Sequence, residues 1–455
     1  MSTAISQKEI NEILEKLGTI VEKNDRIDPE LYKRYNVKRG LRDVDGTGVL
    51  VGLTEIGDVR AYIFDEEEKV PTEGRLLYRG IEINDLVLGF QGEKRFGFEE
   101  CCYLLLFGEL PDKKLLKEFG ELLGELRTLP AGFTEDMILK APSRDIMNKL
   151  ARSVLVSYSF DGNPDDNSLK NTLRQCIELI ARFPTMAAYG YQAKSHYHDG
   201  KSLYIHTPKK ELGTAENLLY MLRPDGKFTA SEAEMLDLAL VLHAEHGGGN
   251  NSTFVTHVVT STGTDTYSSI AAAIGSLKGP QHGGANLKVM GMMEEIKNNV
   301  KNWEDEAEVA GYLSKIMRKE AFDKSGLIYG VGHAVYTKSD PRTILLKQKA
   351  QELAAEKGME KEYKLYTLIE KLSPEVFFKE KKSDKVICAN VDFYSGFVYK
   401  SLGIPVELYT PIFAVGRIAG WCAHIMEELV NGGKIFRPAY KCVEAKKGYI
   451  PLDER

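Results

Sequence analysis

The chain has 455 residues, of which 43% are hydrophobic and 28% are charged, and its formal net charge is −6 at pH 7. This length can bury a large core and predicts one or two domains of ordinary globular composition. The charge balance gives no basic footprint for a nucleic acid, and no apolar run is long enough to span a membrane.

The N-terminus and the cysteines indicate a compartment. The first residues carry neither the apolar region of a signal peptide nor the acid-poor composition of a transit peptide. The six cysteines are scattered, and only Cys101 and Cys102 are neighbours, which is not a metal-ligand spacing. We therefore expect free thiols and a cytoplasmic protein.

The first predicted elements are one amphipathic helix and a few short strands. Apolar residues recur at helical spacing over residues 7–23, which predicts a helix there. Residues 48–53, 59–63 and 76–81 have the composition of strands, and we expect a turn at 57–58 to join the first two.

From Phe98 onward the sequence predicts a mostly helical chain, because apolar positions recur every three to four residues between Gly, Pro and Asp-Asn clusters. Ser231 and Glu234 have the spacing of a capping box, so a helix should begin there and run to Leu242. Further helices are expected at 97–107, 112–127, 144–158, 168–189, 266–277, 342–357, 360–373, 393–402 and 410–430, with two more between 287 and 325.

Residues 191–212 are predicted to form a polar connector that contains His196, His198 and His206. No cysteine or carboxylate pattern accompanies these histidines. They are therefore interpreted as solvated loop residues rather than as metal ligands.

Three of the nine histidines stand directly beside glycines at predicted helix ends, namely His246, His282 and His333. Glycine has no Cβ, so a ligand or another segment can approach the backbone closely, and three such sites in one chain suggest convergence. His282 precedes a predicted helix start, which disfavours a positive charge and so favours a neutral imidazole. An incidental histidine in a tight turn is the alternative.

A carboxylate and three arginines complete the candidate site. Asp392 follows a short apolar run, and it is either a helix N-cap or a desolvated carboxylate that can act as a base near neutral pH. Arg342 opens a predicted helix. Arg417 lies in an apolar helix, where it needs an anionic partner, either an internal salt bridge or a ligand. Arg437 alone would be a solvated surface residue, but several fixed guanidinium groups indicate a ligand with more than one carboxylate.

Together these motifs resemble the citrate synthase family, in its bacterial type, over residues 40–450. The resemblance rests on the order and spacing of several segments and not on any single one. These are 46–54, Tyr78–Ile81, Gly108–Pro111, His243–His246, Gly279–Asn286, Gly332–Val335, Asp340–Arg342, Asn390–Asp392, Arg417 and Arg437–Pro438.

The resemblance implies a mainly α, two-domain helical fold with a few short β-strands near the N-terminus. Residues 1–40 would be an N-terminal helical extension, and 41–286 the first part of a large domain. Residues 287–391 would be a small domain that closes over the substrates. Residues 392–455 would complete the large domain, with a tail reaching the partner subunit of a homodimer.

The resemblance also implies an acyltransferase of the tricarboxylic acid cycle. It would condense acetyl-CoA with oxaloacetate, release citrate and CoA, and use neither a metal nor a cofactor. His282, His333 and Asp392 would be catalytic. His246, Arg342, Arg417 and, from the other subunit, Arg437 would bind oxaloacetate, whereas Gly330, Val331, Gly332 and Lys385 would bind CoA.

The same sequence is compatible with two rival functions. A 2-methylcitrate synthase would use propionyl-CoA on the same scaffold, and one methylene changes binding by only about 1–3 kcal/mol. A non-catalytic CoA-binding helical scaffold would be expected to lack His282, His333 or Asp392, and all three are present.

Overall fold

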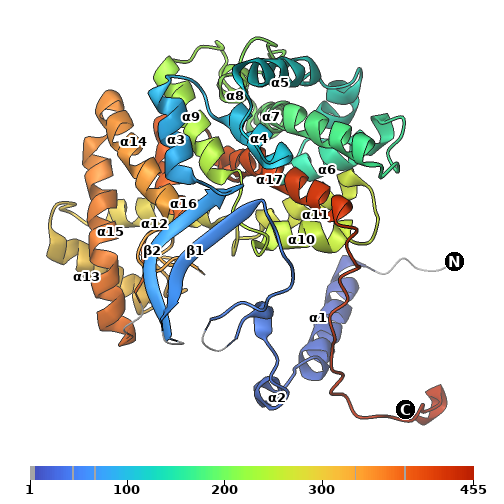
Figure 1. Cartoon of the computed structure of the whole chain (residues 1–455). Helices are drawn as coiled ribbons and strands as arrows, with labels where there is room; N and C mark the ends of the chain where they lie inside the picture. The colour runs from blue at the N-terminus through green and yellow to red at the C-terminus, as the bar shows by residue number, and fades with distance from the viewer. Residues whose placement is uncertain (1–5, 44–45, 66–67, 334, 384–385) are drawn as a thin grey trace. The chain divides into compact units, whose positions relative to one another are not determined.

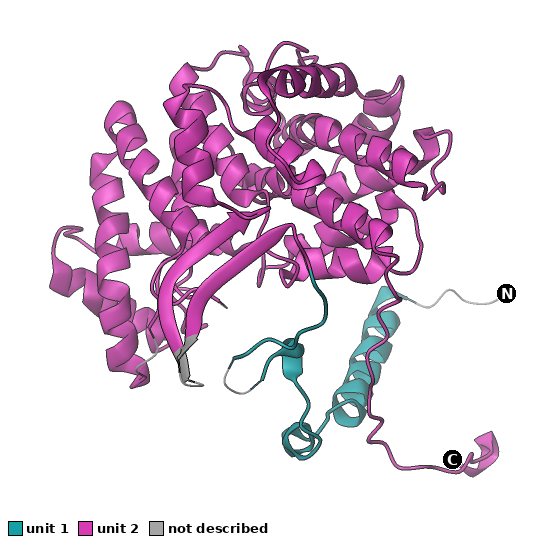
Figure 2. Ribbon diagram, viewed as in Figure 1, with its two compact units in different colours: residues 1–53 teal, residues 54–455 magenta. Residues whose placement is uncertain are grey.

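The computed structural model describes residues 6–43, 46–65, 68–333, 335–383 and 386–455. The chain forms two compact units, residues 1–53 and 54–455 (Figure 2). The first unit contains helix α1 (Gln7–Asn24), which confirms the first predicted helix, and helix α2 (Pro29–Arg34). A capping box between Ser6 and Glu9 starts α1.

The strand prediction at 48–53 is wrong. Gly48 makes an isolated bridge with Arg42, and the residues after it have no regular structure. A strand needs a hydrogen-bonded neighbour along its length. The segment has the right composition, but among the described residues only Gly48 and Val49 bond to a neighbouring segment, at Arg42 and Leu41.

The second unit begins with a three-stranded antiparallel sheet in the order β1 (Gly57–Asp65), β2 (Glu68–Tyr78) and β3 (Ile81–Glu82). Gly57 pairs with Tyr78 and Asp58 pairs with Leu77, so these residues start a strand and do not form the predicted turn. The predicted strand at 76–81 is the end of β2, followed by a turn at Arg79 and Gly80, both with positive φ.

The rest of the unit is helical (Figure 1). The helices are α3 (Ile83–Gly92), α4 (Phe98–Phe107), α5 (Lys113–Leu126), α6 (Ile146–Phe160), α7 (Leu169–Asp199), α8 (Thr214–Leu222), α9 (Ala230–His243), α10 (Asn251–Thr260), α11 (Thr266–Lys278), α12 (Ala285–Asn299), α13 (Glu306–Met317), α14 (Pro341–Lys357), α15 (Glu360–Lys381), α16 (Val391–Ser401) and α17 (Tyr409–Val430). The mainly α prediction is confirmed. Helices α2, α3, α8 and α10 were not predicted, and α10 consists largely of Thr and Val, which are weak helix formers.

The connector predicted at 191–212 is wrong in its first part, because α7 continues to Asp199 and ends at Gly200 with φ of 71°. Residues 183–195 of α7 are buried on every side, so the polar residues there have buried partners, whereas the last turn of the helix is partly exposed. Gln192, for example, donates to the carbonyls of Met221 and Leu222. His196 and His198 therefore belong to the last turn of a helix, and His206 lies in the following loop.

The capping box of α9 lies two residues before the predicted one. Thr229 Oγ1 accepts from the Glu232 amide at 3.2 Å, and the Glu232 carboxylate accepts from the Thr229 amide at 2.9 Å. A capping-box spacing thus occurs twice in this stretch, as Thr-x-x-Glu and as Ser-x-x-Glu, and only the tertiary structure selects between the two.

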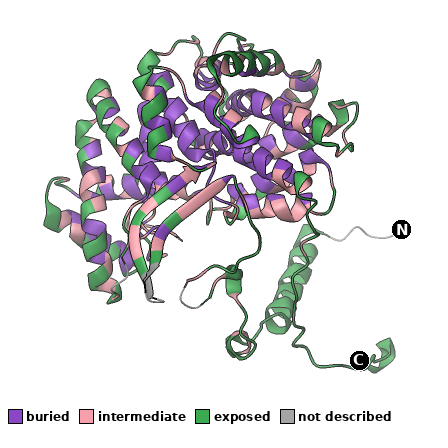
Figure 3. Ribbon diagram, in the orientation of Figure 1, coloured by how far each residue is buried: buried purple, intermediate pink, exposed green. Residues whose placement is uncertain are grey.

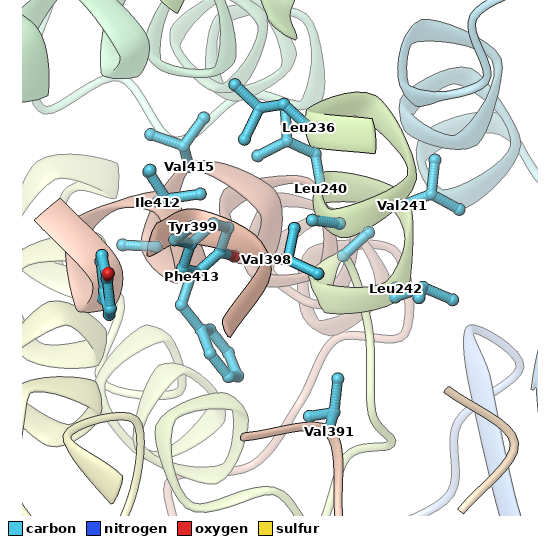
Figure 4. Close-up of a cluster of buried hydrophobic side chains, with 14 of the residues drawn as sticks. Leu236, Leu240, Val241, Leu242, Val391, Val398, Tyr399, Ile412, Phe413 and Val415 are labelled. Atoms are coloured by element: carbon cyan, nitrogen blue, oxygen red, sulfur yellow. The ribbon is translucent and has the colours of Figure 1, made fainter. Parts of the chain in front are cut away.

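Helix α17 forms the centre of the core. All of its residues from Tyr409 to Met426 are buried, and it contacts α4, α7, α9 and α10 (Figure 3). Side chains of α9, α16 and α17 meet in one apolar cluster that includes Leu240, Val398 and Ile412 (Figure 4). A Cβ added at Gly416 would lie 2.8 Å from the Leu240 carbonyl oxygen, so this glycine permits the close approach of α17 to α9.

No helix in the described part of the chain is long and apolar enough to cross a membrane. The boundaries proposed at residues 287 and 391 fall inside the second unit, and the division into a large and a small domain stays a prediction.

Candidate active site

His282 lies in the turn between α11 and α12. Gly283 and Gly284 serve the turn itself, since a Cβ on Gly283 would lie 2.6 Å from the Leu277 side chain. The Ser252 amide donates to His282 Nε2 at 3.4 Å, and Ser252 Oγ lies 3.0 Å from the same nitrogen. Because Nε2 accepts a hydrogen bond, we assign the ring proton to Nδ1.

The environment of His282 keeps its imidazole neutral. Desolvation, and next the positive charge of Arg417, lower the pKa of His282 to about 4. A neutral ring agrees with the expectation from the sequence, but burial and not a helix terminus is the main cause. Trp421 Nε1 donates to Ser252 Oγ at 3.1 Å and so fixes the serine that holds the ring.

Asp392 is not the N-cap of α16. Asn390 caps this helix, with its side-chain oxygen accepting from the Asp392 amide at 3.0 Å. Oδ1 of Asp392 is buried and has no hydrogen-bond partner among the described residues. Desolvation raises the pKa of Asp392 to about 7, with Arg342 as the largest opposing influence. The carboxylate thus has the properties of a general base at neutral pH.

His246 and His333 form an aromatic group with Tyr336. The ring centroids of the two histidines lie 5.2 Å apart, and Tyr336 stacks on His333 at 4.7 Å. His333 Nδ1 accepts from the amides of Val335 and Tyr336, each at 3.0 Å, so Nε2 carries the proton and is a donor. Burial lowers the pKa of His246 and keeps this ring neutral.

Arg342 and Arg417 have different partners. Arg342 donates through Nε and Nη2 to Asp340 at 3.0 and 2.7 Å, a bidentate internal pair. Arg417 is fully buried and donates from Nε to the His243 carbonyl at 2.7 Å. Its Nη1 and Nη2 have no hydrogen-bond partner in the described part of the chain. Burial lowers the pKa of Arg417 to about 10, which still leaves it charged at neutral pH.

An unpaired buried guanidinium is costly unless an anion binds it. The internal salt bridge considered for Arg417 is not formed among the described residues, so its two free nitrogens favour an anionic ligand. The pKa of Asp392 responds to both Arg342 and Arg417, and that of His246 to His282 and His333. The structure therefore brings His246, His282, His333, Arg342, Arg417 and Asp392 to one site.

The predicted CoA-binding loop joins the two halves of this site. Gly332 N–H donates to the Cys388 carbonyl at 2.7 Å, and Asn390 N–H donates to the Gly330 carbonyl at 2.9 Å. These bonds place the segment before His333 beside the segment before Asp392. Gly330 has φ of 78°, and a Cβ there would lie 2.8 Å from Phe393.

A cavity of about 780 Å³ lies along this loop and is lined by Gly330, Val331, Gly332 and His333. Lys288 and Lys381 also line it, and neither was predicted as a binding residue. Lys385, which was predicted, lies outside the described residues.

The structure does not bring Arg437 to the site of its own chain. Arg437 is exposed in the segment after α17. The preceding residue, Phe436, donates its amide to Ser261 Oγ at 3.2 Å and packs edge-on against Phe254 at 5.7 Å. The contribution of Arg437 to a partner subunit stays a prediction.

Sequence reasoning missed Ser252, Tyr336 and Asn390, which orient the three catalytic candidates. Asn390 was visible as an N-cap residue before α16. Ser252 follows a run of glycines and asparagines and gave no comparable signal, because its partner His282 is 30 residues away.

A helical core that surrounds a buried carboxylate, neutral imidazoles and buried guanidinium groups defines an enzyme site for an anionic substrate. The family model "Citrate synthase, C-terminal domain" matches residues 43–439. The chain belongs to the citrate synthase family.

Known relatives carry two names. A citrate synthase of Synechocystis is 35% identical over 388 residues, covering 84% of this chain and 89% of that protein. A 2-methylcitrate synthase of Shewanella oneidensis is 34% identical over 384 residues, covering 84% and 92%.

Solved citrate synthases have the same fold. The structure from Thermotoga maritima matches with a TM-score of 0.72 and 30% identity, over 92% of this chain and 99% of that one. The structure from Thermoplasma acidophilum, a ternary complex with carboxymethyl coenzyme A and oxaloacetate, matches with a TM-score of 0.74 and 26% identity, over the same 92% and 99%.

Proposed function

We propose that this protein is a citrate synthase, an acyltransferase that condenses acetyl-CoA with oxaloacetate and releases citrate and CoA. The observation that carries the proposal is that one site contains a base, Asp392 with a pKa of about 7, and a neutral imidazole, His282. Next to them lies buried Arg417, whose Nη1 and Nη2 have no hydrogen-bond partner among the described residues. Deprotonation of a thioester methyl group needs such a base together with a donor to the thioester oxygen.

Oxaloacetate binds first in this scheme. Its carboxylates accept from the free Nη1 and Nη2 of Arg417 and from Arg342, and His246 donates a further hydrogen bond. Binding of the dianion compensates the buried positive charge of Arg417. The substrate therefore supplies the partner that the protein lacks.

Enolisation follows when Asp392 removes a methyl proton from acetyl-CoA. His282 donates its Nδ1 hydrogen to the thioester oxygen and stabilises the enol. The enol carbon then attacks the ketone carbon of oxaloacetate, and His333 Nε2 protonates the ketone oxygen. Water hydrolyses the resulting citryl thioester to citrate and CoA.

The adenine and phosphates of CoA would lie in the cavity beside Gly330–Gly332, with Lys381 and Lys288, the latter paired with Asp323 at 3.0 Å, as the lining cations. The reaction uses no resident metal or cofactor, since a base and two hydrogen-bond donors suffice for each step. We further propose a cytoplasmic homodimer of the tricarboxylic acid cycle in which Arg437 completes the oxaloacetate site of the other subunit.

The length of the acyl chain that the enzyme accepts needs a direct test, because relatives named 2-methylcitrate synthase are about as similar to this chain as those named citrate synthase. The test compares kcat/KM for acetyl-CoA and propionyl-CoA at saturating oxaloacetate. We expect a preference for acetyl-CoA of roughly 10- to 200-fold, the discrimination that one methylene allows. A preference for propionyl-CoA would assign a 2-methylcitrate synthase, and no turnover of either would indicate a binding scaffold.

A further inference from the structure

A cluster of histidines and glutamates lies outside the proposed catalytic residues, between α10 and α17. His257 Nε2 and His424 Nδ1 are 3.0 Å apart. Glu427 Oε2 lies 3.6 Å from His424 Nδ1, and these three ligand atoms all lie within 4.8 Å of one another. Sequence reasoning did not find the cluster, because 167 residues separate its two histidines.

The spacing of the three atoms suits a small cation. Ligands about 2.0–2.1 Å from a tetrahedral metal ion lie roughly 3.3–3.4 Å from each other. The two short separations in the cluster, 3.0 and 3.6 Å, lie on either side of this value. Small side-chain rotations are therefore sufficient to close the set on an ion.

The outer nitrogens of both rings face carboxylates. His257 Nδ1 contacts Glu428 at 2.8 Å, and His424 Nε2 lies 3.2 Å from Glu245. In metal sites a ligating histidine directs its second nitrogen to a carboxylate or carbonyl, which fixes the tautomer and makes the ring a better ligand. Both histidines of this cluster have that arrangement.

The charges of the cluster also favour a cation. Three carboxylates, Glu245, Glu427 and Glu428, surround two imidazoles that cannot both be protonated at 3.0 Å from each other. The Glu55 amide donates to Glu427 Oε1 at 2.8 Å, while Oε2, on the side of the rings, is buried, has no hydrogen-bond partner among the described residues and contacts His424 Nδ1 only at 3.6 Å. A buried carboxylate oxygen that has only this long contact, next to two imidazole nitrogens, is a site for positive charge.

We propose that His257, His424 and Glu427 bind a divalent transition-metal ion of the zinc type. The set of two imidazoles and one carboxylate suits zinc and leaves a fourth position for water. The side chains of His257 and Glu427 are each 11% exposed, so an ion can reach the cluster from solvent.

The ion has a structural role in this proposal. It joins α10, which carries Ser252, to α17, which carries Arg417. Through Glu245 it also holds the loop of His246, since the Glu245 carboxylate accepts from the Gly247 amide. The bound ion would thus brace three segments that carry the substrate-binding and catalytic residues.

The experiment uses the full-length protein, stripped with a chelator and titrated with Zn²⁺ or Co²⁺. Bound metal is measured by mass spectrometry, and Co²⁺ is followed by its visible absorption. We expect one ion per chain, a tetrahedral Co²⁺ spectrum and a melting temperature that rises with Zn²⁺ concentration. Absence of retained metal and of the Co²⁺ spectrum in the wild type would overturn the proposal without any variant.

Variants locate the ion. His257→Gln and Glu427→Gln should abolish the Co²⁺ spectrum, and Glu428→Gln should weaken affinity by about 10- to 100-fold, the usual effect of losing a histidine's carboxylate partner. His196→Gln, at the end of α7, is the matched control and should bind as the wild type does. Unchanged binding in folded His257→Gln would place the ion elsewhere. None of these measurements depends on turnover, so their failure is distinct from a failure of the proposed reaction.

Discussion

The position of Asp392 in the fold raises its pKa above that of an ordinary aspartate. Asn390 takes over the capping of α16, which leaves the Asp392 carboxylate free, and burial then raises its pKa to about 7. His282 is adjusted in the opposite direction, to a pKa of about 4. Burial disfavours the charged form of each group, so the same cause yields a stronger base than an ordinary carboxylate and a neutral donor.

Replacement of Asp392 by Ala should lower kcat by about 10²- to 10⁴-fold, the usual contribution of a general base. Oxaloacetate binding should persist, because the arginines are unchanged. Exchange of the acetyl-CoA methyl protons with deuterated solvent, followed by NMR, measures the lost step directly. Asp199→Asn, at the exposed end of α7, is the control. Exchange at the wild-type rate in the Asp392 variant would show that another group is the base.

The pH dependence follows from the same pKa. Only the ionised form of Asp392 accepts a proton, so kcat/KM for acetyl-CoA should fall about tenfold per pH unit below pH 7. Protonation of His282 would add a second loss only near pH 4. A profile from pH 5 to 9 tests this, and a flat profile between pH 5 and 7 contradicts the assignment.

Ser252 orients His282 through its side chain as well as its amide. Ser252→Ala removes the Oγ contacts with His282 and Trp421 but keeps the amide donor. One hydrogen bond contributes about 0.5–1.5 kcal/mol, so kcat should fall about 2- to 13-fold while the KM for oxaloacetate stays constant. Ser157→Ala, a buried serine of α6, is the control. An equal loss in both variants would indicate a general packing effect.

At the scale of elements, the contact between α9 and α17 positions the anion site. The two backbones approach closely at Gly416, and the next residue, Arg417, donates to the carbonyl of His243 at the end of α9. Rigid contacts between helices thus hold a guanidinium group whose Nη1 and Nη2 have no hydrogen-bond partner in the described part of the molecule.

Gly416→Ala should lower the free energy of unfolding by about 1–3 kcal/mol, because its Cβ would press on the Leu240 carbonyl. Gly311→Ala in α13 is the matched control, since a Cβ there meets nothing within 4 Å. That control should be neutral or slightly stabilising, as alanine is the better helix former. Thermal melts of both variants measure the difference in stability. Equal melting temperatures would show that α17 can shift away from α9 without loss of stability.

At the scale of the whole molecule, Arg437 decides whether the active site is shared. Its exposure in a single chain agrees with a role in a second chain but does not require one. Arg437→Ala alone should reduce activity strongly, because oxaloacetate loses one of its cationic partners.

Mixed dimers provide the test. Arg437→Ala and Asp392→Ala chains, refolded together, should recover about a quarter of wild-type activity, since half of the dimers are hybrids with one intact site of two. Absence of recovery in verified hybrids would place Arg437 in the site of its own chain or outside any site.

Helical periodicity predicted most of the long helices, because an amphipathic pattern is local. It failed where burial is not one-sided, as at residues 191–195 of α7, and where helices are short, as in α10. The strand predicted at 48–53 rested on composition alone, and composition does not specify the neighbouring segment that a strand needs.

By itself the sequence determined the chemistry that this protein can perform, since the spacing of its histidines, arginines and Asp392 marked one family. The tertiary structure decided which groups are free to act. Asp392 is a base because Asn390 caps its helix, and Arg342 is paired whereas Arg417 is not. The tertiary structure also brings His257 and His424 together. Protonation and pairing depend on burial and on neighbours distant in the sequence, and only the folded chain specifies these.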